Sequence, residues 1–134
     1  MEQEKNGSQC SDGRTYEVLI PFKLPSFNEY TRACRSNKYI GASMKKDYEE
    51  QISVFIAKLP KFDNPIRLDF VWMEDNKRRD ADNIAFSKKF ILDAMVKCGK
   101  IKDDSWRYVK GFTDSFEHGK EAGVRIIIEE VTDV

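Results

Sequence analysis

Between positions 66 and 73 a large apolar residue recurs at every second position, in alternation with Arg67, Asp69, Val71 and Met73. This alternation constrains the fold more than any other feature of the chain. A period of two places successive side chains on opposite faces of a β-strand. One face then carries large apolar residues: Ile66, Leu68, Phe70 and Trp72. A strand with one apolar face must be covered by other elements, so the segments on either side have to supply helices and further strands.

Two helices are predicted. Ser43 is a suitable N-cap, and the apolar residues over 44–58 recur at helical spacing. A second helix begins at Asp80 or Asp82 and ends near Cys98, where Gly99 follows in the position that favours a left-handed residue.

The rest of the chain supplies strands and a loop. Residues 25–42 mix turn formers with basic and aromatic residues, which predicts a basic loop. Further strands are predicted over residues 16–22, 106–113 and 124–131. The order of elements predicts an α+β fold over residues 15–134, a single small domain with one mixed β-sheet and two main helices packed on it. Residues 1–14 are polar and predict a flexible tail.

Composition narrows the function classes. The 134 residues carry 23 basic and 23 acidic side chains, but segment 14–46 has seven basic against two acidic and segment 75–110 has ten against six. Two basic segments favour a local face for a polyanion, with a solvated surface as the simpler alternative. A single histidine excludes sites built from two, and three cysteines without a secretory signal predict reduced thiols in the cytoplasm. No apolar run approaches the roughly 18 residues of a membrane span.

Four aspartates form two groups that could act together. Asp80 and Asp82 follow the central strand, and alternation in an extended chain points both carboxylates to one side. Asp103 and Asp104 follow the second helix, and an antiparallel return of the chain would bring them near the first pair. Gathered carboxylates repel one another unless Mg²⁺ or Mn²⁺ neutralises them. The alternative is structural, because Asp is common at helix caps and in turns.

The order of these residues carries a family resemblance. Arg79-Asp80-Ala81-Asp82-Asn83 precedes Leu92-Asp93-Ala94 in the predicted helix, and Asp103-Asp104 comes next. This order resembles the RusA-type Holliday junction resolvases, in which R-D-x-D-N precedes a helix with L/F-D-A-L, then Gly, then D-D. The segment Pro25–Tyr30 (PSFNEY) is similar to the family's P-S-x-N-x-Y. The matched segments span most of the chain, from about residue 16 to residue 131.

The resemblance implies a RusA-like fold and a homodimeric endonuclease that depends on Mg²⁺ or Mn²⁺. Such enzymes cut four-way DNA junctions in recombination and repair and are often encoded by a phage or prophage. The family's metal aspartates correspond to Asp80, Asp82 and Asp104, with Asp103 beside them, and Arg79 matches the basic residue before the first aspartate. It also implies a cytoplasmic protein of bacterial or phage origin.

One position departs from the family pattern. The family has a catalytic lysine four residues after the second aspartate, where this chain has Phe86. The stretch from Asp82 to Asp93 is about three residues longer than usual, and counting back from Asp93 places the lysine at Lys89, with Lys88 next to it. Seven residues after Asp82 is two helical turns, so Lys89 is slightly favoured. An ion pair with Asp93 at i,i+4 is the structural alternative for Lys89.

The remaining candidates are basic or polar residues that would hold DNA. Backbone phosphates dominate the affinity of proteins for DNA, so cations near the aspartates are the predicted contacts. They are Arg32, Arg35, Lys38, Lys77, Arg78, Arg79, Lys100 and Lys102. Asn83 either fixes a carboxylate by hydrogen bonding or simply begins the helix.

Three rival interpretations stay open. The first is a protein of the same fold that binds branched DNA without cutting it, which the displaced lysine motivates. The second is a small domain with no nucleic-acid role, whose aspartates are helix caps. The third and weaker one is a restriction-type nuclease built on the D-x-K of Asp75–Lys77, with Asp63 or Asp69 as its upstream acid.

Overall fold

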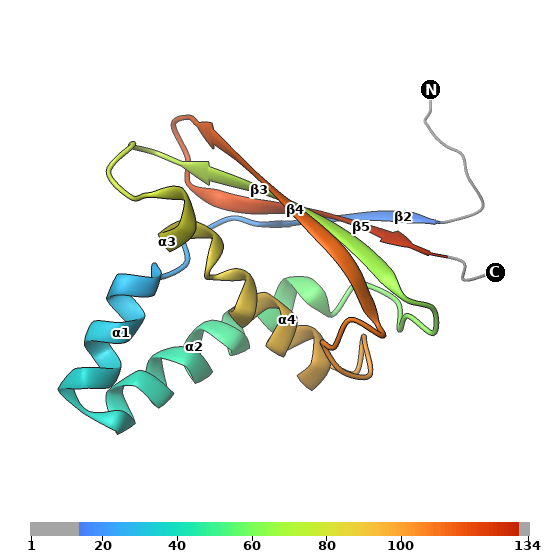
Figure 1. The fold of residues 1–134 in the computed structure, drawn as a ribbon, viewed down its shortest axis with the longest axis horizontal. Coiled ribbons are helices and arrows are strands. Elements are labelled where there is room, and N and C mark those ends of the chain that lie inside the picture. Colours follow the sequence, from blue (N-terminus) through green and yellow to red (C-terminus); the bar gives the residue numbers. More distant parts are fainter. Residues whose placement is uncertain (1–13, 132–134) are drawn as a thin grey trace.

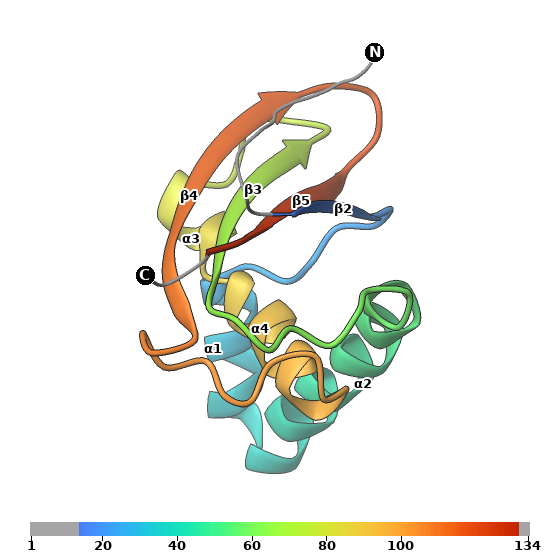
Figure 2. The ribbon, with the colours of Figure 1, turned by 90° about the vertical axis from the view of Figure 1, so that its right-hand side faces the viewer.

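A mixed four-stranded sheet forms one layer of the molecule, and helices α1, α2 and α4 lie below it in Figure 2. The computed structural model describes residues 14–131. The strands are β2 (Thr15–Ile20), β3 (Ile66–Glu74), β4 (Val109–His118) and β5 (Gly123–Glu130). Their order across the sheet is β2-β5-β3-β4 (Figure 1). The α+β prediction with one mixed sheet is confirmed.

The directions of the strands decide where the sites can lie. β5 pairs antiparallel with both β2 and β3, whereas β4 runs parallel to β3 from the Ile66–Val109 pair to the Glu74–His118 pair. Parallel neighbours need a crossover connection, and α3 and α4 lie in the segment that provides it. The chain therefore leaves β3 at one end of the sheet and enters β4 at the other.

The predicted loop over 25–42 is wrong, because most of it is helical. Helix α1 (Phe27–Ser36) begins with a capping box in which the Ser26 side chain accepts from the Glu29 N–H and the Glu29 side chain accepts from the Ser26 N–H. This S-x-x-E signature was present in the sequence. Ala33 is the only buried residue of α1, so no apolar stripe accompanied the signature.

Helix α2 (Lys38–Ile56) starts earlier than the predicted 44–58, and its N-cap is Asn37 rather than Ser43. The Asn37 side chain accepts from the Tyr39 N–H at 2.7 Å. Gly41 lies inside this helix because α1 crosses close to it. A Cβ at Gly41 would lie 2.5 Å from the sulfur of Cys34.

The second predicted helix is broken into α3 (Ala81–Ala85) and α4 (Lys88–Lys97). Around the break the backbone forms tighter i→i−3 hydrogen bonds, such as Ser87 N–H to the Ile84 carbonyl at 3.1 Å. The Ser87 hydroxyl also donates to the Pro25 carbonyl and ties the break to the segment before α1. Gly99 follows α4 with φ of 73°, as its predicted place after the helix requires.

The strand predictions are accurate except at β4. β2 and β5 agree with the predicted strands to within two residues, but β4 covers 109–118 instead of 106–113. β4 is an edge strand and most of its residues are exposed. An exposed edge tolerates polar residues on both faces, so its alternation is too weak to mark where it ends.

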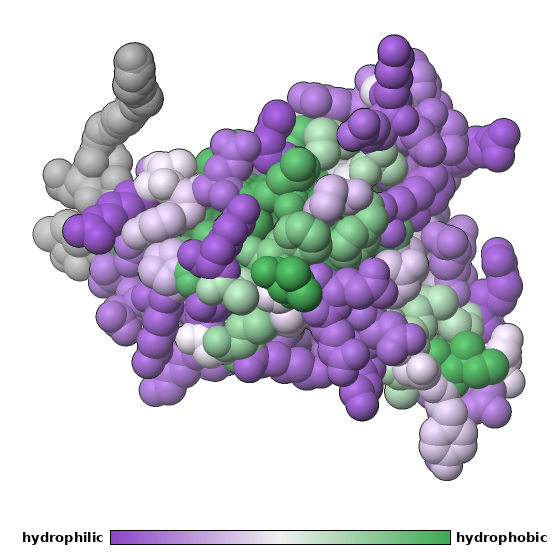
Figure 3. Space-filling view, turned by 180° about the vertical axis from the view of Figure 1, so that it is seen from behind, coloured by the Kyte–Doolittle hydropathy of each residue, from purple (hydrophilic) through white to green (hydrophobic). Residues whose placement is uncertain are grey.

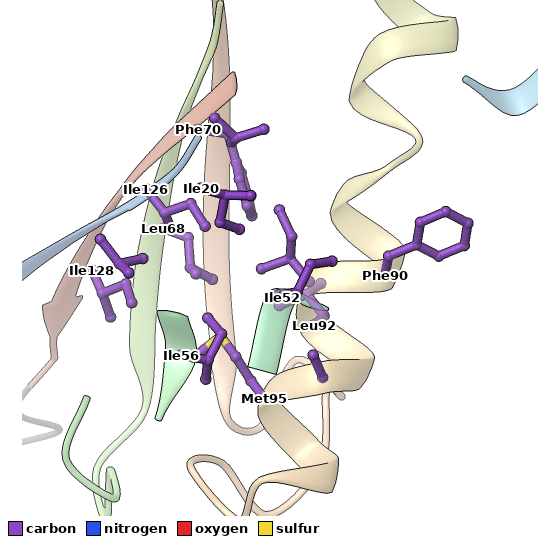
Figure 4. Close-up of a cluster of buried hydrophobic side chains, with 14 of the residues drawn as sticks. Ile20, Ile52, Ile56, Leu68, Phe70, Phe90, Leu92, Met95, Ile126 and Ile128 are labelled. Carbon is purple, nitrogen blue, oxygen red and sulfur yellow. The ribbon is translucent and has the colours of Figure 1, made fainter. Parts of the chain in front are cut away.

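The core lies between the sheet and the helices. Figure 4 shows strand residues such as Leu68, Phe70 and Ile126 facing helix residues such as Ile52 and Met95. All five are fully buried. Apolar side chains from both layers thus remove one face of the sheet from water, which is the main stabilising contribution in a domain of this size.

Residues 1–13 of the predicted tail lie outside the described residues. Arg14, its last residue, uses its carbonyl to accept from the Glu130 N–H at 2.9 Å. None of the helices within residues 14–131 combines the length and apolar character that crossing a membrane requires.

Candidate active site

Two of the matched motifs, more than 50 residues apart in the sequence, meet in space. The Asn83 side-chain oxygen accepts from the Asn28 N–H in the first turn of α1 at 3.2 Å. Phe86 packs edge-on against Phe27 and stacks on Tyr30, with ring centroids 5.1 and 5.8 Å apart. Asn83 therefore joins α3 to the start of α1 and does not fix a carboxylate. The PSFNEY and RDADN segments form one structural unit.

Arg79 holds this unit together. Its guanidinium forms a bidentate ion pair with Glu74, with N–O distances of 3.0 and 2.7 Å. The same group donates to the Leu24 carbonyl at 2.9 Å and to Glu29 at 3.3 Å. The side chains of Arg79 and Glu74 are only 16% and 9% exposed. Arg79 was predicted to contact DNA, but in this conformation it connects the end of β3 to the segment before α1.

The pKa of Glu29 reflects both burial and the hydrogen bonds of this unit. Burial raises the pKa of its carboxyl, but the hydrogen bonds from Ser26 and the charge of Arg79 outweigh burial, so the net pKa is lowered. Glu29 is therefore ionised at neutral pH, where it caps α1 and pairs with Arg79.

Asp80 and Asp82 stand exposed at the start of α3. Asp80 occupies the N-cap position with extended backbone, at φ −76° and ψ 155°, yet its side chain makes no capping hydrogen bond. The Asp82 carboxylate accepts a hydrogen bond from the Asn83 N–H at 3.0 Å. Within residues 14–131 neither side chain pairs with a cation, so both carboxylates can accept a ligand from solvent. The helix-cap alternative gains no support from their geometry.

The other aspartates lie towards the opposite end of the sheet. The predicted cluster depended on an antiparallel return, but β4 is parallel to β3, so the loop before β4 starts near the beginning of β3. Asp103 accepts from the Ser105 N–H at 2.8 Å, and hydrogen bonding with Ser105 lowers the Asp103 pKa. Asp104 pairs with Lys89 at 3.1 Å. Among the described residues no group of three or more acidic, His or Cys side chains is arranged to hold a metal ion.

The break at residues 86–87 separates the two candidate lysines. Lys88, not Lys89, lines a pocket with Asp82, together with Ala85, Phe86 and Phe116. The two-turn spacing from Asp82 to Lys89 presupposed one continuous helix, which the break removes. The extra residues between Asp82 and Asp93 are thus accommodated in a turn rather than along one helix.

Lys89 belongs to a chain of alternating charges. Its ammonium lies 3.3 Å from Asp93 and 3.1 Å from Asp104, and Asp93 also pairs with Lys45 at 2.8 Å. The i,i+4 ion pair expected as an alternative for Lys89 is therefore formed. The hydrogen bond to Asp104 raises the Lys89 pKa against a smaller opposing effect of burial, with Asp93 adding to the rise. Asp93, the aspartate of the L-D-A motif, thus fixes the lysine that pairs with Asp104.

This charged chain extends into the interior. Lys45 also pairs with Glu49 at 2.6 Å, and Lys97 contacts the other oxygen of the same carboxylate. Glu49 is 3% exposed, so it is a buried acid satisfied by two lysines. The network couples α2 and α4 to the loop that carries Asp104.

The carboxylates of Asp80 and Asp82 are suitable ligands for a hard divalent cation, but they do not surround one on all sides. Carboxylate oxygens are the ligands that Mg²⁺ prefers, and Mg²⁺ is commonly held by one or two carboxylates together with substrate phosphates and water. Asp80 and Asp82 offer such oxygens at an exposed position. Asp104 would have to exchange its contact with Lys89 to join them.

The predicted DNA contacts fall into two groups. Lys100 donates to the carbonyls of Ala57 and Leu59, at 3.1 and 2.6 Å, and so caps the end of α2. Like Arg79, it makes contacts within the protein in this conformation. The other predicted cations have exposed side chains and remain candidates for phosphate: Arg32, Arg35, Lys38, Lys77, Arg78 and Lys102. The D-x-K alternative weakens further, because Asp75 lies in the turn after β3 and pairs with Lys23 at 3.2 Å.

One residue near the pocket escaped the sequence analysis. Asp114 accepts from the Lys88 ammonium at 2.6 Å and from the indole N–H of Trp72 at 2.8 Å. A signal existed, because Asp114 is a lone acid between Phe112 and Phe116 on one face of a strand. The predicted strand ended at residue 113, so this alternation was not recognised.

Comparison with known proteins does not assign this chain to a family. No protein-family model matches the chain, and no curated protein matches its sequence significantly. The resemblance to RusA-type resolvases rests on the motif residues of the sequence alone.

Proposed function

We propose that this protein is a metal-dependent, structure-selective DNA endonuclease of the RusA type, which resolves four-way junctions by paired phosphodiester cuts. The observation that carries the proposal is that two motifs far apart in the sequence lie in contact in the structure. The PSFNEY and RDADN segments pack on each other through Asn83 and Arg79, and this unit presents Asp80 and Asp82 to solvent without capping bonds. A local structure of buried ion pairs and aromatic contacts holds the exposed aspartates in place.

The residues divide the work as follows. Asp80 and Asp82 would hold Mg²⁺ or Mn²⁺ together with substrate phosphate and water, because Asp103 and Asp104 lie towards the opposite end of the sheet. When bound, such an ion supplies an activated water and neutralises charge on the phosphate. Lys88 beside Asp82 would orient and neutralise the phosphodiester, whereas Lys89 stays paired with Asp93 and Asp104. Exposed cations such as Arg78 hold the flanking backbone, so selectivity comes mainly from branched shape.

We infer a homodimer, because a four-way junction has two-fold symmetry and paired cuts need paired sites. Seen from behind, the surface gathers hydrophobic residues near its centre, surrounded by hydrophilic ones (Figure 3). Contiguous apolar surface is typical of protein interfaces. The proposed protein acts in the bacterial cytoplasm, whether the host or a phage encodes it. Sedimentation of the free protein tests the dimer, and a monomer at micromolar concentration would contradict it.

A non-catalytic DNA-binding protein of the same fold is the second candidate. It is favoured by the separation of Asp104 from Asp80 and Asp82, and by the absence of a three-ligand group among the residues described. In that case the aspartates contribute nothing to binding, and the exposed cations account for all affinity.

Cleavage of a labelled four-way junction decides between the two. Wild-type protein is incubated with the junction or with a linear duplex, in Mg²⁺, in Mn²⁺ and in EDTA. Asp82→Asn removes one carboxylate charge at the site. Asp47→Asn is the matched control, because Asp47 is an exposed acid on α2 away from the motifs. We expect metal-dependent cuts in the junction alone, lost in Asp82→Asn and kept in Asp47→Asn.

Binding separates the remaining outcomes. Salt-sensitive junction binding without cuts in either metal, unchanged in Asp82→Asn, would establish the non-catalytic protein. Absence of salt-sensitive DNA binding would reject both nucleic-acid proposals.

A further inference from the structure

Lys88 is the more buried of the two candidate lysines, and its ammonium is held on several sides. The side chain is 15% exposed, whereas that of Lys89 is 54% exposed. The Lys88 nitrogen lies 2.6 Å from Asp114, and 3.9 and 5.6 Å from the ring centroids of Phe112 and Phe70. Cation–π contacts of this kind attract an ammonium to the ring faces. Lys88 is therefore fixed before any ligand arrives.

Asp114 is itself fixed from the core. One carboxylate oxygen accepts from Lys88, and the other accepts from the indole N–H of Trp72 at 2.8 Å. Trp72 is 2% exposed, and its ring stacks on Phe70 with centroids 5.5 Å apart. Because a buried Trp cannot move without disturbing the core, the hydrogen bond sets the position of Asp114, and Asp114 sets that of Lys88.

The pocket beside these groups joins them to the proposed site. It has a volume of about 500 Å³ and is lined by Asp82, Lys88 and Asp114 together with apolar residues. A lysine ammonium has three N–H donors, and Asp114 accepts one of them. The Phe112 ring lies against another side of the ammonium, and the remaining N–H is left for an anion that enters beside Asp82.

We propose that Asp114 is a positioning residue, which with Trp72 and Phe112 holds the Lys88 ammonium in the Asp82 pocket, ready for a DNA phosphate. The inference rests on the proposed endonuclease and assigns the lysine role to Lys88 rather than Lys89. Rotamer freedom that a flexible lysine would lose on binding is already lost in the free protein.

A double-mutant cycle on junction cleavage tests the coupling. Asp114→Asn keeps an oxygen acceptor for Trp72 but loses the charge that holds Lys88. We expect it to lower kcat by about 10- to 100-fold, as a misplaced group does, with a much smaller change in KM. Lys88→Met should lose at least as much, and the double variant should match Lys88→Met, because Asp114 acts through Lys88. Effects that multiply would overturn the proposal.

Two further variants serve as controls for the role of Asp114. Glu117→Gln removes an acid from the same strand but from the opposite face of the sheet, so cleavage should stay at the wild-type rate. Asp114→Glu restores the charge on a longer side chain and should recover part of kcat. An Asp114→Asn variant as active as wild type would sink the assignment. Circular dichroism melts of each variant establish that the fold persists.

Amine reactivity gives a readout that needs no cleavage. Reductive methylation followed by mass spectrometry measures the rate at which each lysine reacts in the free protein. Lys88 should react slowly in wild type and several-fold faster in Asp114→Asn, while the rate at Lys89 stays the same. An unchanged rate at Lys88 would refute positioning by Asp114 even if junctions are cut. A faster rate in a protein that cuts no branched DNA would uphold the positioning and reject the endonuclease.

Discussion

The bidentate pair between Arg79 and Glu74 makes a strong prediction about stability. Arg79→Met removes the guanidinium and leaves the Glu74 carboxylate, 9% exposed, without its two hydrogen bonds. Removing one partner of a buried ion pair costs about 3–5 kcal/mol, because the other charge stays buried. Lys23 lies 3.9 Å from Glu74 and offers partial compensation, so the expected loss is about 3 kcal/mol, the lower end of that range.

Urea unfolding measures this loss. With an m-value of about 2 kcal/mol/M for a small protein, the midpoint should fall by about 1.5 M without a change in slope. Arg79→Lys keeps the charge but not the bidentate geometry and should lie between the two proteins. Combining Arg79→Met with Glu74→Met should recover much of the loss, because no charge then remains buried.

The matched control is Arg78→Met, which alters the exposed neighbour. It should change stability by less than about 0.5 kcal/mol while weakening junction binding and reducing its salt dependence by about one phosphate contact. If Arg79→Met were as stable as Arg78→Met, the structural role of Arg79 would be refuted. The prediction that Arg79 contacts DNA directly would then be favoured.

Two further predictions concern the helical layer. Gly41→Ala should lower the free energy of unfolding by about 1–2 kcal/mol, because the new Cβ would lie 2.5 Å from the Cys34 sulfur. Helix propensity alone predicts the opposite, a stabilised variant. That result would show that α1 and α2 are not so close. Burial raises the Asp93 pKa, but the hydrogen bond and charge of Lys45, helped by Lys89, bring it below its ordinary 3.8. The unfolded state then binds more protons in acid, so the stabilisation is present above about pH 4 and is lost as the pH falls through the lower folded-state pKa. Urea titrations of wild type and Asp93→Asn should converge over that range, and a difference that does not vary with pH would contradict this pairing.

Local patterns were sufficient for most of the architecture. Alternation marked the first half of β3, because Leu68 and Phe70 are buried on one face while Arg67 and Asp69 are exposed on the other. Gly99 was correctly placed after a helix, since its φ of 73° is a property of one residue. Helix α1 was missed although its capping box was present, because an exposed helix with a single buried residue lacks the apolar stripe on which the prediction relied.

The candidate site depends on contacts that no local pattern contains. Sequence order indicated Asp80, Asp82 and a following lysine, but the break at residues 86–87 decided that Lys88 reaches the Asp82 pocket and that Lys89 turns to Asp104. The parallel pairing of β4 with β3, a choice between distant strands, placed Asp104 towards the other end of the sheet.

Local sequence patterns thus indicated where most strands lie and which acids and cations are available for chemistry. Which charges neutralise one another depends on the folding of the whole domain. Arg79 turns inward to Glu74, whereas Arg78 beside it stays in solvent, and Asp114 finds Lys88 and Trp72 across the domain. The physical reason is that a charge is worth little in water and much when buried, and burial depends on packing between segments far apart in the chain.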